Sequence, residues 1–173
     1  NFKAVYSNKD LPTKTNEKYV KLTHTSRNAP INSGDSGLGN HMLQYASTLG
    51  IAHERNAIAC GDVHSHLKTI FKGPWIKPCP TNVKFIHVVE RGFGLYDENL
   101  VTNGAPSISV GTYLQSWKYF KNINDDIRRI FAFKDKFSPD SWISEHRKNS
   151  STLVAVHLRF GRFNVAHSYI RLP

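Results

Sequence analysis

The feature that most constrains the fold is a glycine-containing turn that leads directly into an amphipathic segment. Gly37 and Gly39 mark the turn, and apolar residues then recur with the helical period at Met42, Tyr45, Ala46, Leu49 and Ala52. Glycine has no Cβ, so the backbone can approach a ligand closely, and the first turn of a helix presents N–H groups that favour an anion. The glycine spacing fits neither the dinucleotide fingerprint nor the P-loop, so the pattern by itself indicates a tight strand-to-helix turn.

Apolar runs and helical patterns alternate along the rest of the chain. Strands are predicted at 19–24, 57–60, 83–89, 108–113 and 152–158. Helices are predicted after the glycine turn and at 62–71, 124–134 and 138–147, with Asp62 and Asn124 as N-caps. Strands that alternate with helices favour a parallel sheet with helices on both faces, so we expect an α/β, Rossmann-like fold. The polar residues 1–18 predict a stem or linker.

The chain is basic, with 23 Lys and Arg against 13 Asp and Glu and a net charge of +10. A solvated basic surface and an anionic partner explain this charge equally well. No acidic residue follows Glu145, whereas basic residues continue to Arg171, and this local bias favours a discrete anion site. Aromatic and basic residues do not interleave in an RNA-binding pattern, so we expect no nucleic-acid partner. No apolar stretch of this sequence approaches the roughly 20 residues of a membrane helix.

The two cysteines, Cys60 and Cys79, are too few for a disulfide scaffold and lack metal-ligand spacing. Two states remain open, either one disulfide formed in an oxidising compartment or two buried thiols. A disulfide would close a loop of about 20 residues and stabilise the fold by roughly 3 kcal/mol. Asn149-Ser150-Ser151 is an N-glycosylation sequon, which is weak support for a luminal location.

A second element, near the C-terminus, also suits an anion. The predicted strand 152–158 leads into His157 and Arg159. α/β sheets bind ligands past the carboxyl ends of their strands, and a guanidinium there can hold a diphosphate through two N–H donors. His157 alone is more typical of a core histidine. Together with the glycine turn, Arg159 indicates a phosphate-bearing ligand.

Three segments give the chain a resemblance to a known family. Gly37–Ala46 closely resembles the amino-terminal motif of the α-1,2-fucosyltransferases, the galactoside 2-α-L-fucosyltransferases of glycosyltransferase family 11. Gly111–Phe120 resembles the family's Gly-Tyr-Phe-Gln-Ser-Trp-Lys-Tyr-Phe segment, and Val156–Arg162 is similar to its Val-His-Val-Arg-Arg-Gly-Asp segment. The three segments occur in the family's order.

The resemblance implies the N-terminal lobe of a GT-B glycosyltransferase. Its activity would be the inverting transfer of L-fucose from GDP-fucose to the 2-hydroxyl of a galactose-terminated glycan, with no cofactor and no obligatory metal. Arg159 would bind the donor diphosphate with support from His157, while Gly37, Gly39 and Asn40 would line the cleft opposite. Such proteins work in the Golgi lumen as type II membrane proteins, so the membrane anchor would be a segment outside this sequence.

The chain departs from the family pattern in the third segment. Phe160 replaces an arginine, and Arg162 replaces an aspartate. Inverting transfer needs a group that accepts the proton of the acceptor hydroxyl, ordinarily a carboxylate. The last 28 residues contain no carboxylate side chain, so the candidates are His167, as a weak one, and three remote acids, Glu90, Asp97 and Glu98.

These observations lead to two alternative functions. Residues 19–150 would form the acceptor-side lobe, and residues 151–173 would form the first strand and loop of an incomplete donor-binding lobe. The chain would then be either part of an active fucosyltransferase or a truncated, inactive isoform or pseudoenzyme that binds glycans or proteins. Trp117 in the second segment could stack on a sugar, although we expect it to be a core aromatic.

Overall fold

A computed structural model describes residues 17–23, 37–92, 94–111, 113–137 and 140–147. The chain divides into two compact units, residues 1–137 and residues 138–173. The first unit contains the β-sheet and the helices around it. In the second unit the described part is one helix, α5 (Asp140–Arg147).

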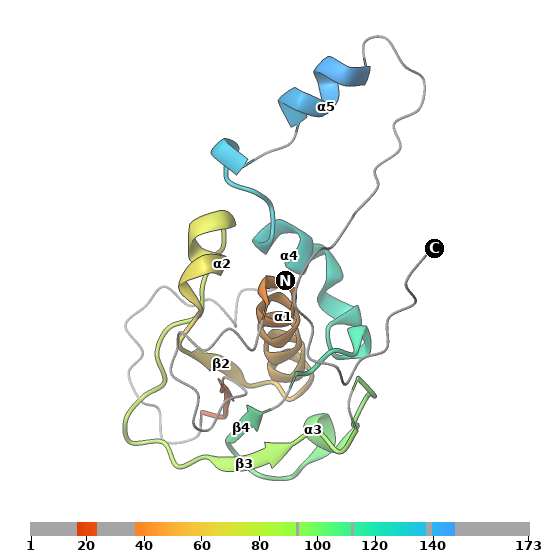
Figure 1. The fold of residues 1–173 in the computed structure, drawn as a ribbon. Helices are drawn as coiled ribbons and strands as arrows, with labels where there is room; N and C mark the ends of the chain where they lie inside the picture. The colour runs from red at the N-terminus through yellow and green to blue at the C-terminus, as the bar shows by residue number, and fades with distance from the viewer. Residues whose placement is uncertain (1–16, 24–36, 93, 112, 138–139, 148–173) are drawn as a thin grey trace, which may run out of the picture. The chain divides into compact units, whose positions relative to one another are not determined.

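The first unit is built on a parallel sheet, as the alternation of strands and helices predicted. Its four strands are β1 (Tyr19–Leu22), β2 (Ile58–Gly61), β3 (Ile86–Val89) and β4 (Ile108–Gly111), in the spatial order β2-β1-β4-β3 (Figure 1). Val20 lies beside Ala59 of β2 on one side and beside Ile108 of β4 on the other. The two central strands, β1 and β4, therefore carry the middle of the core.

Helix α1 (Leu38–Glu54) is the main helix of this unit and packs against β1 and β2. Its residues from Gln44 to Ala52 are all buried, and Tyr45 and Leu49 are completely so. The smaller helices are α2 (Ser65–Ile70), α3 (Asn99–Thr102), α4 (Asn124–Ile130) and the 3-10 helices η1 (Trp117–Tyr119), η2 (Lys121–Ile123) and η3 (Asp135–Phe137). Four of these, α2, α3, η1 and η2, contact α1, which makes it the centre of the helical layer.

Two predicted helix caps are wrong. Helix α2 begins at Ser65, because the Nδ1 atom of His64 rather than Asp62 accepts the backbone N–H of a first-turn residue, His66, at 3.3 Å. Asn124 is the first residue of α4 and not its cap, because the chain already turns through η2 before it. Strand β3 starts at Ile86, three residues later than the predicted position 83.

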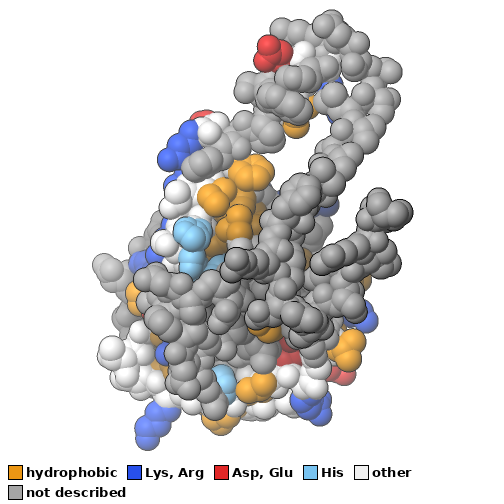
Figure 2. All heavy atoms as spheres, viewed as in Figure 1, with side chains coloured by type: hydrophobic (Ala, Val, Ile, Leu, Met, Phe, Trp, Pro, Cys, Tyr) orange, Lys and Arg blue, Asp and Glu red, His pale blue; other side chains and the backbone are white. Residues whose placement is uncertain are grey.

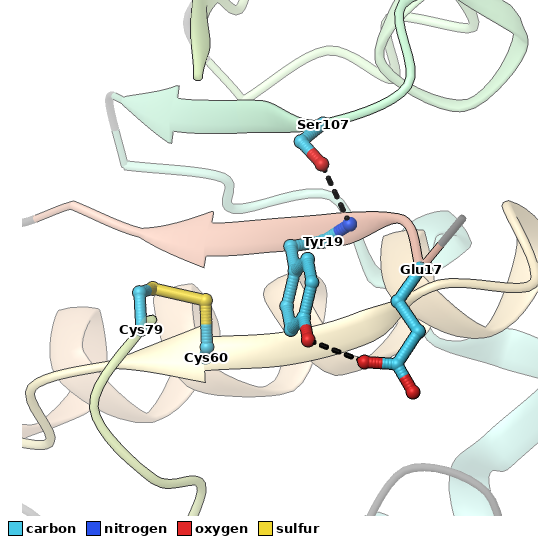
Figure 3. The surroundings of a disulfide bond; sticks show 5 residues. All are labelled: Glu17, Tyr19, Cys60, Cys79 and Ser107. Atoms are coloured by element: carbon cyan, nitrogen blue, oxygen red, sulfur yellow. Dashed lines mark hydrogen bonds between the residues drawn. A yellow bond between two sulfur atoms is a disulfide. The ribbon is translucent and has the colours of Figure 1, made fainter. Parts of the chain in front are cut away.

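A disulfide joins Cys60 in β2 to Cys79 in the coil between α2 and β3, with the two Cα atoms 4.8 Å apart (Figure 3). Next to it, the N–H of Gly61 donates to the carbonyl of Lys77 at 2.9 Å. Of the two states that the sequence left open, the structure therefore has the disulfide. The bond and the neighbouring hydrogen bond attach the coil to β2, the strand at one edge of the sheet.

Helix α1 lies very close to another backbone segment at Gly50. A Cβ placed on this residue would lie 2.0 Å from the carbonyl oxygen of Tyr119 and 2.8 Å from the Cα of Phe120. Real Cβ atoms do not make such contacts with backbone, so only glycine allows η1 to lie this close to α1.

We expect the variant Gly50→Ala to lower the free energy of unfolding by about 1–3 kcal/mol, because the added methyl group displaces η1 from α1. Chemical denaturation measures the change. Gly39→Ala is the matched control in the same helix, since a Cβ there meets no heavy atom of another described segment within 4 Å. Because alanine favours helix over glycine, the control should be up to about 1 kcal/mol more stable than the wild type. Equal unfolding curves for Gly50→Ala and the wild type would contradict this account.

Candidate functional site

The candidate site lies at the carboxyl edge of the sheet. All strand pairs are parallel, so the four strands end on the same side. The segment after β1 leads to the first turn of α1, and the segment after β4 leads to Gln115 and η1. Sheets of this kind bind ligands in the crevice beyond the carboxyl ends of their strands.

The start of α1 and the segment after β4 are joined by side chains. Gln115 Nε2 donates to Asn40 Oδ1 at 2.9 Å, across 75 positions of the sequence. One residue earlier, the carbonyl of Leu114 accepts a hydrogen bond from Ser47 Oγ at 2.8 Å, and both groups are buried. Asn40 and Ser47 are seven residues apart, which places them on one side of α1, two turns from each other.

Leu114 has an unusual backbone conformation. Its φ is +49°, in the left-handed region that leucine rarely adopts, and its side chain is completely buried. Residues held in such conformations concentrate at functional sites, where the surrounding structure fixes them. The burial of the Leu114 side chain and the hydrogen bond from Ser47 to its carbonyl hold this conformation in place. The next residue, Gln115, then reaches Asn40.

The first turn of α1 is open to an anion. The residue before it, Gly37, has extended backbone (φ −70°, ψ 166°), no side chain in the described part of the chain caps the helix, and the first turn has no acidic residue. Among the described residues, a Cβ at Gly37 or Gly39 would meet no heavy atom within 4 Å outside the helix's own backbone. Neither glycine therefore serves a left-handed conformation or a close packing contact. What the two glycines leave is space beside N–H groups that carry partial positive charge.

Three histidines surround the start of α1, and the sequence analysis did not identify this cluster. The rings of His41 and His64 stack with centroids 4.0 Å apart, and the ring of His66 lies 4.7 Å from that of His64. Figure 2 shows histidine side chains at the surface in this region, next to apolar side chains. The spacing His64-x-His66 was the available signal, but its meaning depended on His41 being brought beside it. Among the described residues no group of three His, Cys, Asp or Glu is arranged to hold a metal ion.

The acidic candidates after β3 are engaged in other interactions. Glu90 is buried and accepts the hydroxyl proton of Tyr119 at 2.9 Å, and the same hydroxyl accepts the N–H of Asp97 at 2.8 Å. Burial raises the pKa of Tyr119, so its hydroxyl remains a donor. Asp97 receives two guanidinium hydrogen bonds from Arg91, at 2.9 and 3.1 Å, and these lower its pKa.

The other candidates are placed as follows. Trp117 is 62% exposed, so the expectation that it belongs to the core is wrong: η1 buries Tyr119 and leaves Trp117 outside. Glu98 is exposed at the start of α3. Outside the described residues lie His157, Arg159, His167 and Asn149, together with Phe160 and Arg162. Their assignments continue to rest on the sequence.

Comparison with known proteins gave no match to a family model, to a curated protein or to a solved structure. Among the described residues, no helix combines the length and the apolar character that crossing a membrane requires. The family resemblance therefore stands on the segments that carry it, and two of these, Gly37–Ala46 and Gly111–Phe120, are the ones joined by Asn40 and Gln115.

The bond between Asn40 and Gln115 predicts an energetic coupling between them. We expect Asn40→Ala and Gln115→Ala each to lower the free energy of unfolding by about 1 kcal/mol, with a coupling of about 0.5–1.5 kcal/mol in the double variant. Denaturant unfolding of the four proteins gives these values. The control is Asn122→Ala, which removes a hydrogen bond to Glu54 at the other end of α1. Its effect on the free energy of unfolding should simply add to the effect of Asn40→Ala. Strict additivity of the Asn40 and Gln115 variants would rule out the bond.

The lowered pKa of Asp97 predicts a pH dependence of stability. The folded state favours the charged carboxylate of Asp97. Its contribution to the free energy of unfolding is therefore complete above the ordinary aspartate pKa of 3.8, and it is lost as the pH falls through the lower pKa that Asp97 has in the folded protein. Asp97→Asn should therefore be less stable than the wild type at neutral pH, and this difference should shrink below about pH 4. Thermal unfolding from pH 2 to pH 7 tests this. The exposed Asp125→Asn serves as the control, and an equal acid response in both variants would contradict the assignment.

Proposed function

We propose that this chain carries the acceptor-side lobe of a GT-B fucosyltransferase of the α-1,2 type. The activity is transfer of L-fucose from GDP-fucose to the 2-hydroxyl of a galactoside. The observation that carries this proposal is the 2.9 Å hydrogen bond between Asn40 and Gln115. It joins the two segments with the strongest resemblance to that family, and it does so beyond the carboxyl ends of the central strands, where α/β proteins bind ligands.

The charges and groups of the site suit a nucleotide-sugar donor. The open first turn of α1 favours an anion, and Gly37 and Gly39 leave room beside it. By the resemblance, Arg159 binds the diphosphate and His157 supports it. The Cys60–Cys79 disulfide supports a compartment such as the Golgi lumen, because disulfides persist in oxidising surroundings.

The proposed reaction is a single displacement at the anomeric carbon of fucose. The 2-hydroxyl oxygen of galactose forms a bond to that carbon while the bond from the carbon to the β-phosphate oxygen of GDP breaks. The electron pair of the broken bond leaves with GDP, and the proton of the hydroxyl passes to a general base. In this scheme Arg159 neutralises the charge that develops on the departing diphosphate.

A second candidate function is a glycan-binding module without transferase activity. The observation that favours it is the arrangement of the acids after β3. Asp97 is bound by Arg91, and Glu90 accepts from the buried Tyr119, so both carboxylates stabilise the loop that contains them. A base for the acceptor hydroxyl would then have to come from another residue, for which the sequence offers the exposed Glu98 and, as a weak candidate, His167.

GDP binding tests the donor site. We expect the chain to bind GDP with a dissociation constant of about 1 mM or weaker, because one charge-assisted contact contributes only about 1.5–3 kcal/mol. Arg159→Ala should abolish the binding, and Asn40→Ala should weaken it. Lys84→Ala is the control, since it removes one exposed positive charge outside the site and should leave the affinity unchanged. Isothermal titration calorimetry measures all four proteins.

Two outcomes would count against the donor site. Equal loss of affinity in Lys84→Ala would indicate binding by net charge alone, and full affinity in Arg159→Ala would remove Arg159 from the site. Transfer of radiolabelled fucose from GDP-fucose to a β-galactoside, lost in Arg159→Ala, would separate the enzyme from the binding module.

A further inference from the structure

Trp117 is the largest side chain that this unit exposes next to the candidate site. It is 62% exposed, and it stands two residues after Gln115, whose amide binds Asn40. A buried tryptophan would remove a large apolar surface from water. The fold instead leaves the indole of Trp117 exposed. The residues that flank the pair Trp117–Lys118 are both buried, and these are Ser116 and Tyr119.

The backbone beneath Trp117 is held in place from several directions. The N–H of Phe120 donates to the carbonyl of Trp117 at 3.2 Å, which closes the turn of η1. The hydroxyl of Tyr119 bonds to Glu90 and Asp97, and the carbonyl of Tyr119 lies against Gly50 of α1. The exposed indole therefore projects from a fixed support, and binding a ligand would not require the backbone to be ordered first.

The loop after β3 adds a second aromatic ring to the same support. The ring of Tyr96 lies 5.0 Å from that of Tyr119, and Tyr96 is 38% exposed. Leu95, its neighbour, is 68% exposed. The segment after β3 and the segment after β4 therefore both expose apolar side chains. The side chain of Tyr119 joins these two segments to each other.

We propose that Trp117 is the stacking surface for the galactose ring of the acceptor glycan. The identity of this sugar rests on the proposed function. The axial 4-hydroxyl of galactose leaves the C–H groups of carbons 3, 4 and 5 together on one face of the ring. The polarised C–H groups of a sugar are attracted to the negative face of an aromatic ring, in the same way that the positive edge of a second aromatic ring is attracted to that face. The sugar hydroxyls then point sideways, away from the aromatic ring.

Titration of the ¹⁵N-labelled full chain with methyl β-D-galactoside tests this assignment. The chain has three tryptophans, Trp75, Trp117 and Trp142, so its indole N–H signals can be assigned by substitution. We expect the Trp117 signal to shift and saturate in the millimolar range, and methyl β-D-glucoside, which differs only at carbon 4, to bind at least several-fold more weakly. Ligand-observed saturation transfer should be strongest at the protons of carbons 3, 4 and 5.

The variants give the decisive comparison. Trp117→Ala should weaken galactoside binding by about tenfold or more, and Trp117→Phe should retain part of it because a ring remains. Ile86→Ala, which shortens an apolar side chain that is 55% exposed on β3, should bind as the wild type does. Thermal unfolding of each variant establishes that it is folded. Absence of galactoside binding in the wild type, or equal binding by Trp117→Ala, would overturn the proposal.

Titration of the same samples with GDP keeps this proposal separate from the proposed function. Galactoside binding that depends on Trp117, without GDP binding, would support the stacking surface and count against the donor site. GDP binding without galactoside binding would support the donor site and overturn the stacking surface. Equal affinity for the galactoside and the glucoside would overturn the assignment of galactose.

Discussion

One side of helix α1 determines where the candidate site lies. Asn40, Ser47 and Gly50 follow one another along that side, and each contacts the chain that continues from β4. Asn40 binds the amide of Gln115, Ser47 binds the carbonyl of Leu114, and Gly50 lies against the backbone of Tyr119. The rest of the helix is fixed by burial against the sheet. The segment after β4 therefore has its position set by α1 along about three turns of helix.

This arrangement couples the packing of the core to the geometry of the site. The contacts at Ser47 and Gly50 are buried and leave little freedom, because a hydroxyl without its acceptor or a methyl group in place of hydrogen would both be costly. The contact at Asn40 lies at the open end of the helix, beside the histidine rings of His41 and His64. Stability is thus concentrated toward the middle of α1, and the exposed, polar end remains available for a ligand.

Local sequence patterns predicted the four described strands and the main helix, because apolar periodicity reflects which residues the sheet buries, while the predicted strand 152–158 lies outside the described residues. They failed where a contact joins distant parts of the chain. Nothing near Asn40 indicates that its partner is Gln115, 75 residues later. Trp117 was expected in the core because large aromatic residues usually are, but in η1 the short helix buries Tyr119 instead. The cap of α2 was missed because His64, two residues after Asp62, accepts the first-turn N–H. The cap of α4 was missed because η2 already turns the chain before Asn124.

The proposed function divides the chemistry of the site into two tasks, and the described residues suit one of them better. Orienting a neutral acceptor sugar requires uncharged polar groups and an aromatic face, which the amides of Asn40 and Gln115 and the indole of Trp117 would provide. Activating a nucleotide sugar requires positive charge at the leaving diphosphate, for which the first turn of α1 offers only partial charge. The proposal assigns the full charge to Arg159, which the sequence resemblance supplies and which lies outside the described residues. Two of the carboxylates considered as a base, Glu90 and Asp97, instead hold the loop after β3, so this loop is a support for Tyr119 and, through it, for the exposed indole of Trp117.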